Sequence, residues 1–250
     1  MSFAKLTLST VIVGSWFALT AAAAHAQSVA VEPAHKVFVE AGLGYGYGMS
    51  NSQFVEVNNG TKLDSPSSRG PALDLAGGYM FLPNLAVYGD LQFASASTLT
   101  GQNEKGDRES LAISYSSFAV GLRATVPVGS GEVYAQFALG FVLPFETERD
   151  RQELNGDSRT TVIGYNSGFG ARGEMGYHYN VNDRLYIAGG LRLQGFATDN
   201  VGRERVRTDK PSGKVEREVY STDPNANNTA QAEALSVQDL HIRLGVGYRF

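Results

Sequence analysis

Large apolar residues occupy every second position in several segments of the chain, most plainly in residues 241–250, HIRLGVGYRF. The apolar or aromatic positions of this stretch are Ile242, Leu244, Val246, Tyr248 and Phe250, and polar residues lie between them. A period of two predicts a β-strand with one apolar and one polar face. The period does not say which face meets water.

Eight such segments can be marked, each long enough to cross a bilayer at a tilt, which takes about 9–11 residues. They cover residues 36–48, 71–81, 85–96, 111–126, 132–145, 165–179, 184–197 and a last stretch that begins near Leu235. The alternation changes phase between Tyr115 and Phe118 and again near Leu235. At Tyr115 to Phe118 we expect a β-bulge or an earlier strand end.

The connections between these segments alternate in length. Short, turn-like connections are Pro83-Asn84, residues 127–131 and residues 180–183; longer polar ones are residues 49–70, 97–110, 146–164 and 198–234. Short turns on one side and long loops on the other are typical of an outer-membrane β-barrel. The sequence therefore predicts an all-β protein, a closed antiparallel eight-stranded up-and-down transmembrane barrel.

Three of the long loops contain hairpin signals of their own. Asn59-Gly60 lies within residues 53–64, Asn155-Gly156 within 146–162, and Lys210-Pro211-Ser212-Gly213 within 203–219. Asn-Gly between extended residues favours a tight hairpin turn. We expect hairpins that continue above the bilayer; disordered loops are the alternative, since high charge also favours disorder.

A Gly-Tyr-x-aromatic motif closes three of the even-numbered segments. Its aromatic residues are Tyr79, Phe81, Tyr177, Tyr179, Tyr248 and Phe250. Facing outward at one height, they would form a girdle at the membrane interface. The alternative is an aromatic core of a soluble barrel, which has no need to align aromatic residues at one rim.

Charged residues lie opposite the apolar stripe, among many glycines and alanines. They are Glu40, Asp74, Asp90, Arg123, Arg172, Glu174, Arg192 and Arg243. Four acids and four bases at one depth predict a buried network in the lumen, where each charge needs a partner. Eight strands enclose an interior just wide enough to be filled by side chains. The last strand should pair with the first, and we expect Arg243 near Glu40 across that seam.

The amino-terminus reads as a secretory signal peptide. Lys5, an apolar run and Ala24-His25-Ala26 predict cleavage after Ala26, so that residues 1–26 are removed and residues 27–250 form one barrel domain. A retained membrane anchor is the alternative. The chain has no cysteine and a net charge of −4. Stability must therefore come from a core, a metal or a closed hydrogen-bonded sheet, of which the predicted barrel supplies the last, and composition gives no sign of a nucleic-acid partner.

These features resemble the small eight-stranded outer-membrane β-barrel superfamily, which includes the OmpA transmembrane domain, OmpX, Ail-type proteins and opacity proteins. The pattern covers residues 27–250, but only the terminal GVGYRF matches in residues. The resemblance implies the Gram-negative outer membrane as location, with outer-membrane lipids and lipopolysaccharide as surroundings. It also implies that Phe250, with Tyr248 and Val246, is read by the outer-membrane assembly machinery. The chain departs from OmpA in having no peptidoglycan-binding domain after the barrel, and from OmpX in its longer loops.

No catalytic, cofactor or metal constellation stands out, so we expect no enzyme. The histidines after the signal peptide, His35, His178 and His241, show no nucleophile spacing, and neither EF-hand nor Cys/His patterns occur. We expect a structural or surface-interaction barrel, adhesin-like, whose loops contact a host or cell-surface ligand. The alternative is a narrow pore for small solutes resembling OmpW, and after it a rim enzyme acting on lipid A. Lipopolysaccharide contact is a further expectation for the basic residues Arg203, Arg205, Arg207, Lys210 and Lys214.

Overall fold

The computed structural model describes residues 35–48, 69–102, 108–153, 156–208, 213–221 and 234–250. These ranges contain eleven β-strands: β1 (Val37–Gly48), β2 (Arg69–Leu82), β3 (Leu85–Gln102), β4 (Arg108–Val128), β5 (Gly131–Val142), β6 (Phe145–Gln152), β7 (Ser158–Tyr165), β8 (Gly168–Asn180), β9 (Leu185–Thr208), β10 (Val215–Ser221) and β11 (Ala234–Arg249). Within them, no helix is long and apolar enough to cross a membrane. The predicted signal peptide, the first hairpin signal at residues 53–64 and Lys210 lie outside the described residues.

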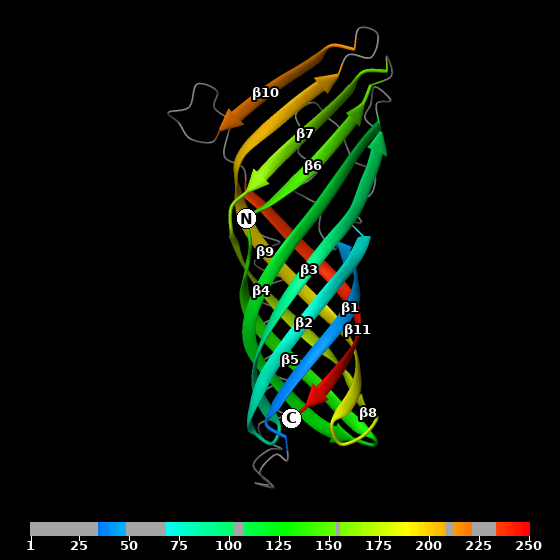
Figure 1. The fold of residues 1–250 in the computed structure, drawn as a ribbon, viewed down its shortest axis with the longest axis vertical. Coiled ribbons are helices and arrows are strands. Elements are labelled where there is room, and N and C mark those ends of the chain that lie inside the picture. Colours follow the sequence, from blue (N-terminus) through cyan, green and yellow to red (C-terminus); the bar gives the residue numbers. More distant parts are fainter. Residues whose placement is uncertain (1–34, 49–68, 103–107, 154–155, 209–212, 222–233) are drawn as a thin grey trace, which may run out of the picture.

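Eight of the strands close into an antiparallel barrel, which confirms the predicted fold class (Figure 1). Around the ring they follow the order β1, β2, β3, β4, β5, β8, β9 and β11. The seam is the pairing of β11 with β1, from Phe38 opposite Arg249 to Gly48 opposite Asp239. The prediction that the last strand pairs with the first is confirmed.

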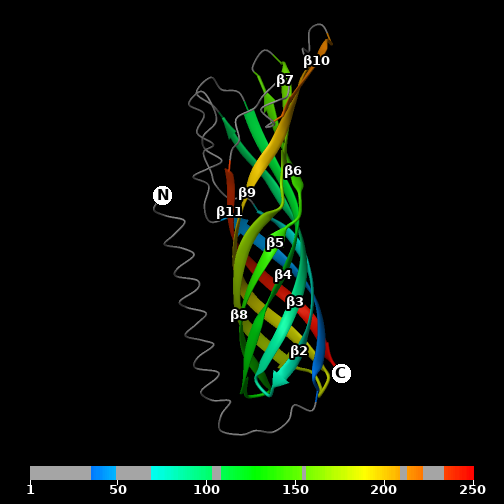
Figure 2. The same ribbon diagram turned by 90° about the vertical axis from the view of Figure 1, so that its left-hand side faces the viewer.

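On one side of the barrel, the wall continues far beyond the ring as an extended sheet (Figure 2). Strand β4 pairs with β5 in its lower part and with β6 in its upper part, and β9 pairs with β8 below and β7 above. Strand β10 adds to the upper part of β9. The described residues of the predicted loops at 97–110, 146–164 and 198–234 are therefore largely strand. Two of the three predicted hairpins are present, as β6–β7 and β9–β10, and their turn glycines Gly156 and Gly213 have φ of 93° and 67°.

The prediction of a bulge or an earlier strand end between Tyr115 and Phe118 is wrong, because β4 continues through these residues from Arg108 to Val128. The pairing of β4 with β3 runs without interruption from Leu85 opposite Ala124 to Ala96 opposite Ile113. Tyr115 is buried inside and Phe118 is exposed outside, so the apolar residues change face while the strand stays regular. The pairing of β11 with β9 is equally regular past Leu235. The irregularity of β3 lies higher, between Ala96 and Leu99.

The exterior of the ring is apolar. Leu43, Leu91 and Leu244 expose 68%, 43% and 65% of their surface, although a water-soluble protein would bury such residues. The Tyr-x-aromatic residues of the three motifs also point outward, at the end of the ring where the short turns lie. An apolar band of this kind around a closed ladder is the exterior of a barrel that spans a lipid bilayer of the outer-membrane type.

A charge on the apolar band should destabilise the barrel. Leu75 faces outward in the middle of β2, so Leu75→Arg places a guanidinium in hydrocarbon and should lower the free energy of unfolding by about 2–4 kcal/mol. The measurement is denaturant unfolding of the barrel refolded in lipid vesicles. Val215→Arg, on the exposed upper hairpin, is the control and should change it by less than about 0.5 kcal/mol. Equal effects of the two variants would contradict the membrane-facing assignment.

Candidate functional site

The eight charged positions marked in the sequence all lie inside the barrel, where none exposes more than 6% of its surface. They come from seven strands: Glu40 from β1, Asp74 from β2, Asp90 from β3, Arg123 from β4, Arg172 and Glu174 from β8, Arg192 from β9 and Arg243 from β11. Each occupies the strand parity opposite to the lipid-facing residues. Alternation along the strands therefore directs all eight into the lumen.

Ion pairs join these side chains into one network. Arg192 contacts three carboxylates: Nη1 lies 2.5 Å from Asp74, Nε 2.7 Å from Glu174 and Nη2 3.3 Å from Asp90. Arg172 Nη1 lies 2.5 Å from the other oxygen of Asp90. Four positive and four negative charges balance, as a low-dielectric interior requires.

The seam is held by the same network. Arg243 Nη1 lies 2.5 Å from Glu40 Oε1 and 3.2 Å from Glu174 Oε1, so the predicted contact of Arg243 with Glu40 is present. Arg123 Nη1 donates to Glu40 Oε2 at 2.8 Å. Arg123 Nε also donates to Gln136 of β5 at 2.7 Å, and Gln136 donates to Glu174 at 2.9 Å. The polar network thereby reaches all eight strands of the ring.

Sequence reasoning missed the tyrosines that complete the network. Tyr134 donates to Glu174 at 2.6 Å, and Tyr186 donates to Glu40 at 3.0 Å. Tyr88 is also fully buried beside Arg123, at 5.4 Å from its guanidinium carbon to the ring centre. A signal for them was present, because each shares the parity of a buried polar residue on its own strand: Asp90 for Tyr88, Gln136 for Tyr134 and Arg192 for Tyr186. These rings occupy space that water would otherwise fill.

At the short-turn end of the lumen, a second group of side chains lies below the network. His178 stacks on Tyr134, with ring centres 4.2 Å apart, and packs against Tyr186 at 4.5 Å. Arg249 Nη2 donates to Glu132 at 2.8 Å and its guanidinium lies over the Tyr186 ring. Gly247 leaves the room for Tyr186, because a Cβ there would lie 2.0 Å from its Cζ.

At the other end of the ring, the lumen is filled by apolar side chains. The buried cluster consists of Ala72, Ala94, Ile113, Tyr115, Val142, Phe145, Tyr165 and Phe196. Aromatic contacts hold it, with Tyr115 and Phe196 4.9 Å apart and Phe145 stacked on Tyr165 at 5.1 Å. Tyr115 links the cluster to the polar interior by donating to Asp239 at 2.9 Å. The lumen is therefore filled by polar groups below and by apolar groups above.

Of the five basic residues predicted to contact lipopolysaccharide, only Lys214 has a side chain within the described part of the structure. Arg203, Arg205 and Arg207 lie on β9, but their side chains are outside the described part of the structure, and Lys214 pairs with Glu216 at 2.6 Å. On the same hairpin, Arg217 donates to Glu204, and this hydrogen bond lowers the pKa of the exposed Glu204 carboxyl. In the described ranges, no group of three or more His, Cys, Asp or Glu side chains could hold a metal ion.

No protein-family model matches the sequence, and no curated protein matches it. Among solved structures, the chain is similar to Neisserial surface protein A, with 14% identity, a TM-score of 0.45, and coverage of 86% of this chain and 97% of that one. It is also similar to a major outer membrane protein from Thermus thermophilus, with 20% identity, a TM-score of 0.47, and coverage of 87% and 100%. A third is the outer membrane protein AlkL, with 13% identity, a TM-score of 0.43, and coverage of 89% and 93%.

Removing the arginine at the centre of the network should be costly. Arg192→Met leaves Asp74, Asp90 and Glu174 without their shared partner, and breaking a buried pair in this way destabilises by about 3–5 kcal/mol. Denaturant unfolding of the refolded barrel measures the loss. Arg217→Met removes an exposed pair on the upper hairpin and should leave stability unchanged. An unchanged midpoint for Arg192→Met would show that the network adds nothing to stability.

Proposed function

We propose that this protein is a sealed outer-membrane barrel that holds a β-sheet platform above the cell surface for contact with another surface. The observation that carries the proposal is the filled lumen, in which four arginines pair with four carboxylates beneath an apolar plug. A pore would need water along its axis, and these side chains occupy that space. The narrow OmpW-like pore remains the alternative.

The part of the molecule left to act is the sheet above the ring. Strands β6, β7 and β10 and the upper part of β9 form a continuous ladder with β4, so the platform is rigid. Its outer face carries exposed charged residues such as Glu148 and Asp150. Binding residues on a rigid scaffold are well placed for recognition. A host or cell-surface ligand is the partner that this arrangement favours.

The outer-membrane assembly machinery is a second proposed partner. Phe250 is exposed at the short-turn end, and its backbone N–H donates to Val37 at 2.8 Å, which fixes it on the first strand. Tyr248 packs against it with ring centres 4.9 Å apart. The resemblance noted in the sequence makes this aromatic pair the assembly signal, and the outward placement leaves it accessible to a partner in the periplasm.

Conductance tests the seal. The refolded barrel in planar bilayers should give no steady current, because the charge network closes the lumen. Arg243→Ala removes the contacts with Glu40 and Glu174 across the seam and should produce a measurable leak. A steady conductance of the unaltered barrel would make the protein a pore.

Removing the highest hairpin tests the platform. Gly202 and Ser221 are directly paired, so residues 203–220 can be replaced by an Asn-Gly turn without opening the ring. A non-adherent Gram-negative strain that displays the full chain should gain adhesion to epithelial cells and between its own cells. The same strain displaying this variant should not. Heat-modifiable migration on a gel controls for a folded barrel. Adhesion equal to that of the full chain would exclude this hairpin as the contact surface.

A further inference from the structure

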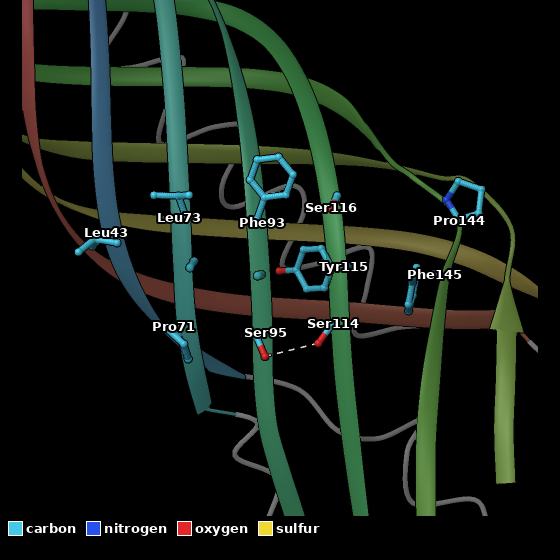
Figure 3. Close-up of a pocket in the computed structure, with 12 residues that line it drawn as sticks. Leu43, Pro71, Leu73, Phe93, Ser95, Ser114, Tyr115, Ser116, Pro144 and Phe145 are labelled. Carbon is cyan, nitrogen blue, oxygen red and sulfur yellow. Dashed lines mark hydrogen bonds between the residues drawn. The ribbon is translucent and has the colours of Figure 1, made fainter.

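The outer surface of the barrel is hollowed by a groove of about 500 Å3 at the end that bears the long hairpins (Figure 3). Its floor and rim come from β1, β2, β3 and β4, together with the start of β6. The side chains that matter for its chemistry point outward: Leu43, Leu73, Phe93, Ser95, Ser114 and Ser116. None of the described residues that line it carries a charge.

Breaks in the wall produce this hollow. The ladder between β2 and β3 ends at Ala72 opposite Ala94, and the next residue, Pro71, has no N–H to continue it. Strand β5 ends at Val142, and Pro144 separates it from β6. The outward side chain of Ser116 is short, so the surface beside Phe93, which lies directly opposite it, is left open.

The groove crosses the level where the exterior changes from apolar to polar. Leu43, Leu73 and Phe93 are neighbours across the strands and belong to the exposed apolar band. One step towards the hairpins, the Ser114 hydroxyl donates to Ser95 at 3.4 Å. Beyond the serines, β6 exposes the acidic residues Glu146, Glu148 and Asp150. The groove therefore lies at the interface of the bilayer on the hairpin side.

We propose that the groove binds an acyl chain of lipopolysaccharide together with the linkage that joins the chain to its sugar. The proposal rests on the outer-membrane placement argued above, with the long hairpins on the outer side, where lipopolysaccharide forms the leaflet. The apolar half of the groove is continuous with the band that faces lipid, so a hydrocarbon chain is its natural occupant. The serine hydroxyls meet the amide and hydroxyl groups near the sugar, and both kinds of group can donate and accept hydrogen bonds.

The uncharged lining separates this site from a phosphate site. A site for lipid phosphates would present arginine or lysine to them. Here recognition comes from shape and hydroxyl groups. A phospholipid ester accepts hydrogen bonds but does not donate them, so the serine pair favours the amide-linked chains of lipopolysaccharide.

Native mass spectrometry of the refolded chain in mild detergent tests the proposal, with rough-type lipopolysaccharide and phosphatidylethanolamine as the two probes. Ser116→Phe fills the groove from the outside, and Gly189→Phe adds the same ring on β9, where nothing lies within 4 Å. We expect one retained lipopolysaccharide on the unaltered chain and on Gly189→Phe. Retention by Ser116→Phe should be about tenfold weaker, which corresponds to about 1.4 kcal/mol.

A second variant covers the case in which Ser116→Phe does not fold. Ser95→Ala with Ser114→Ala keeps the groove but removes the hydroxyls of this serine pair, and should lower the preference for lipopolysaccharide over phosphatidylethanolamine. Equal retention of the two lipids by the unaltered chain, undiminished retention by the folded variants, or pairing of two barrels through the groove would each overturn the proposal. Such results would leave the conductance and adhesion tests untouched, so this failure is distinct from failure of the proposed function.

Discussion

The rest of the structure depends on the need to pair every backbone N–H and C=O inside hydrocarbon. An open sheet would leave two unpaired edges in lipid, so β11 must return to β1, and eight strands are enough to close the ring. Closure then fixes the interior, because a ring of eight has a lumen only as wide as the side chains that fill it. The charged network and the apolar cluster both fill this narrow lumen, the network in its middle and the cluster at the end that bears the long hairpins.

Polarity inverts along the axis of the barrel. Inside the bilayer, the wall is apolar outside and charged inside; above it, Tyr115, Phe145 and Phe196 face inward and the exposed positions of β6 carry Glu146, Glu148 and Asp150. The same strands pass through both regions without changing direction. Whether a residue faces inward or outward is therefore set by its odd or even position along the strand, and whether an inward residue is charged or apolar is set by its depth in the membrane. The apolar cluster thus closes the hairpin end of a membrane barrel, and the sheet above it is mostly exposed or half-buried.

This inversion explains how far the sequence could be interpreted. The eight lipid-crossing strands and the inward parity of Arg243 and Glu40 follow from alternation, because lipid excludes charged residues from the outer face, and closure follows from the need to pair every backbone group in lipid. The change of phase at Tyr115 predicts a bulge only if apolar residues are assumed to face outward along the whole of β4. The upper strands β6 and β7 could be expected only as a hairpin within a loop, since their charged outer face carries no membrane signal. The inward tyrosines were missed because an aromatic residue suits lipid, interface and lumen alike, and only its parity separates the three.

A charged lumen also gives the barrel a defined register. If both faces of each strand were apolar, a slip by one residue would exchange the faces at little cost. Arg192 is bound to Asp74, Asp90 and Glu174, which come from three other strands. If one of these strands slipped by one residue, its charged side chain would face lipid and the groups it pairs with would be left without a partner. Such a network adds less to net stability than its short distances suggest, because desolvation offsets the attraction. Its stronger effect is to exclude other registers of strand pairing. A single closed register keeps the platform above the ring fixed relative to the membrane.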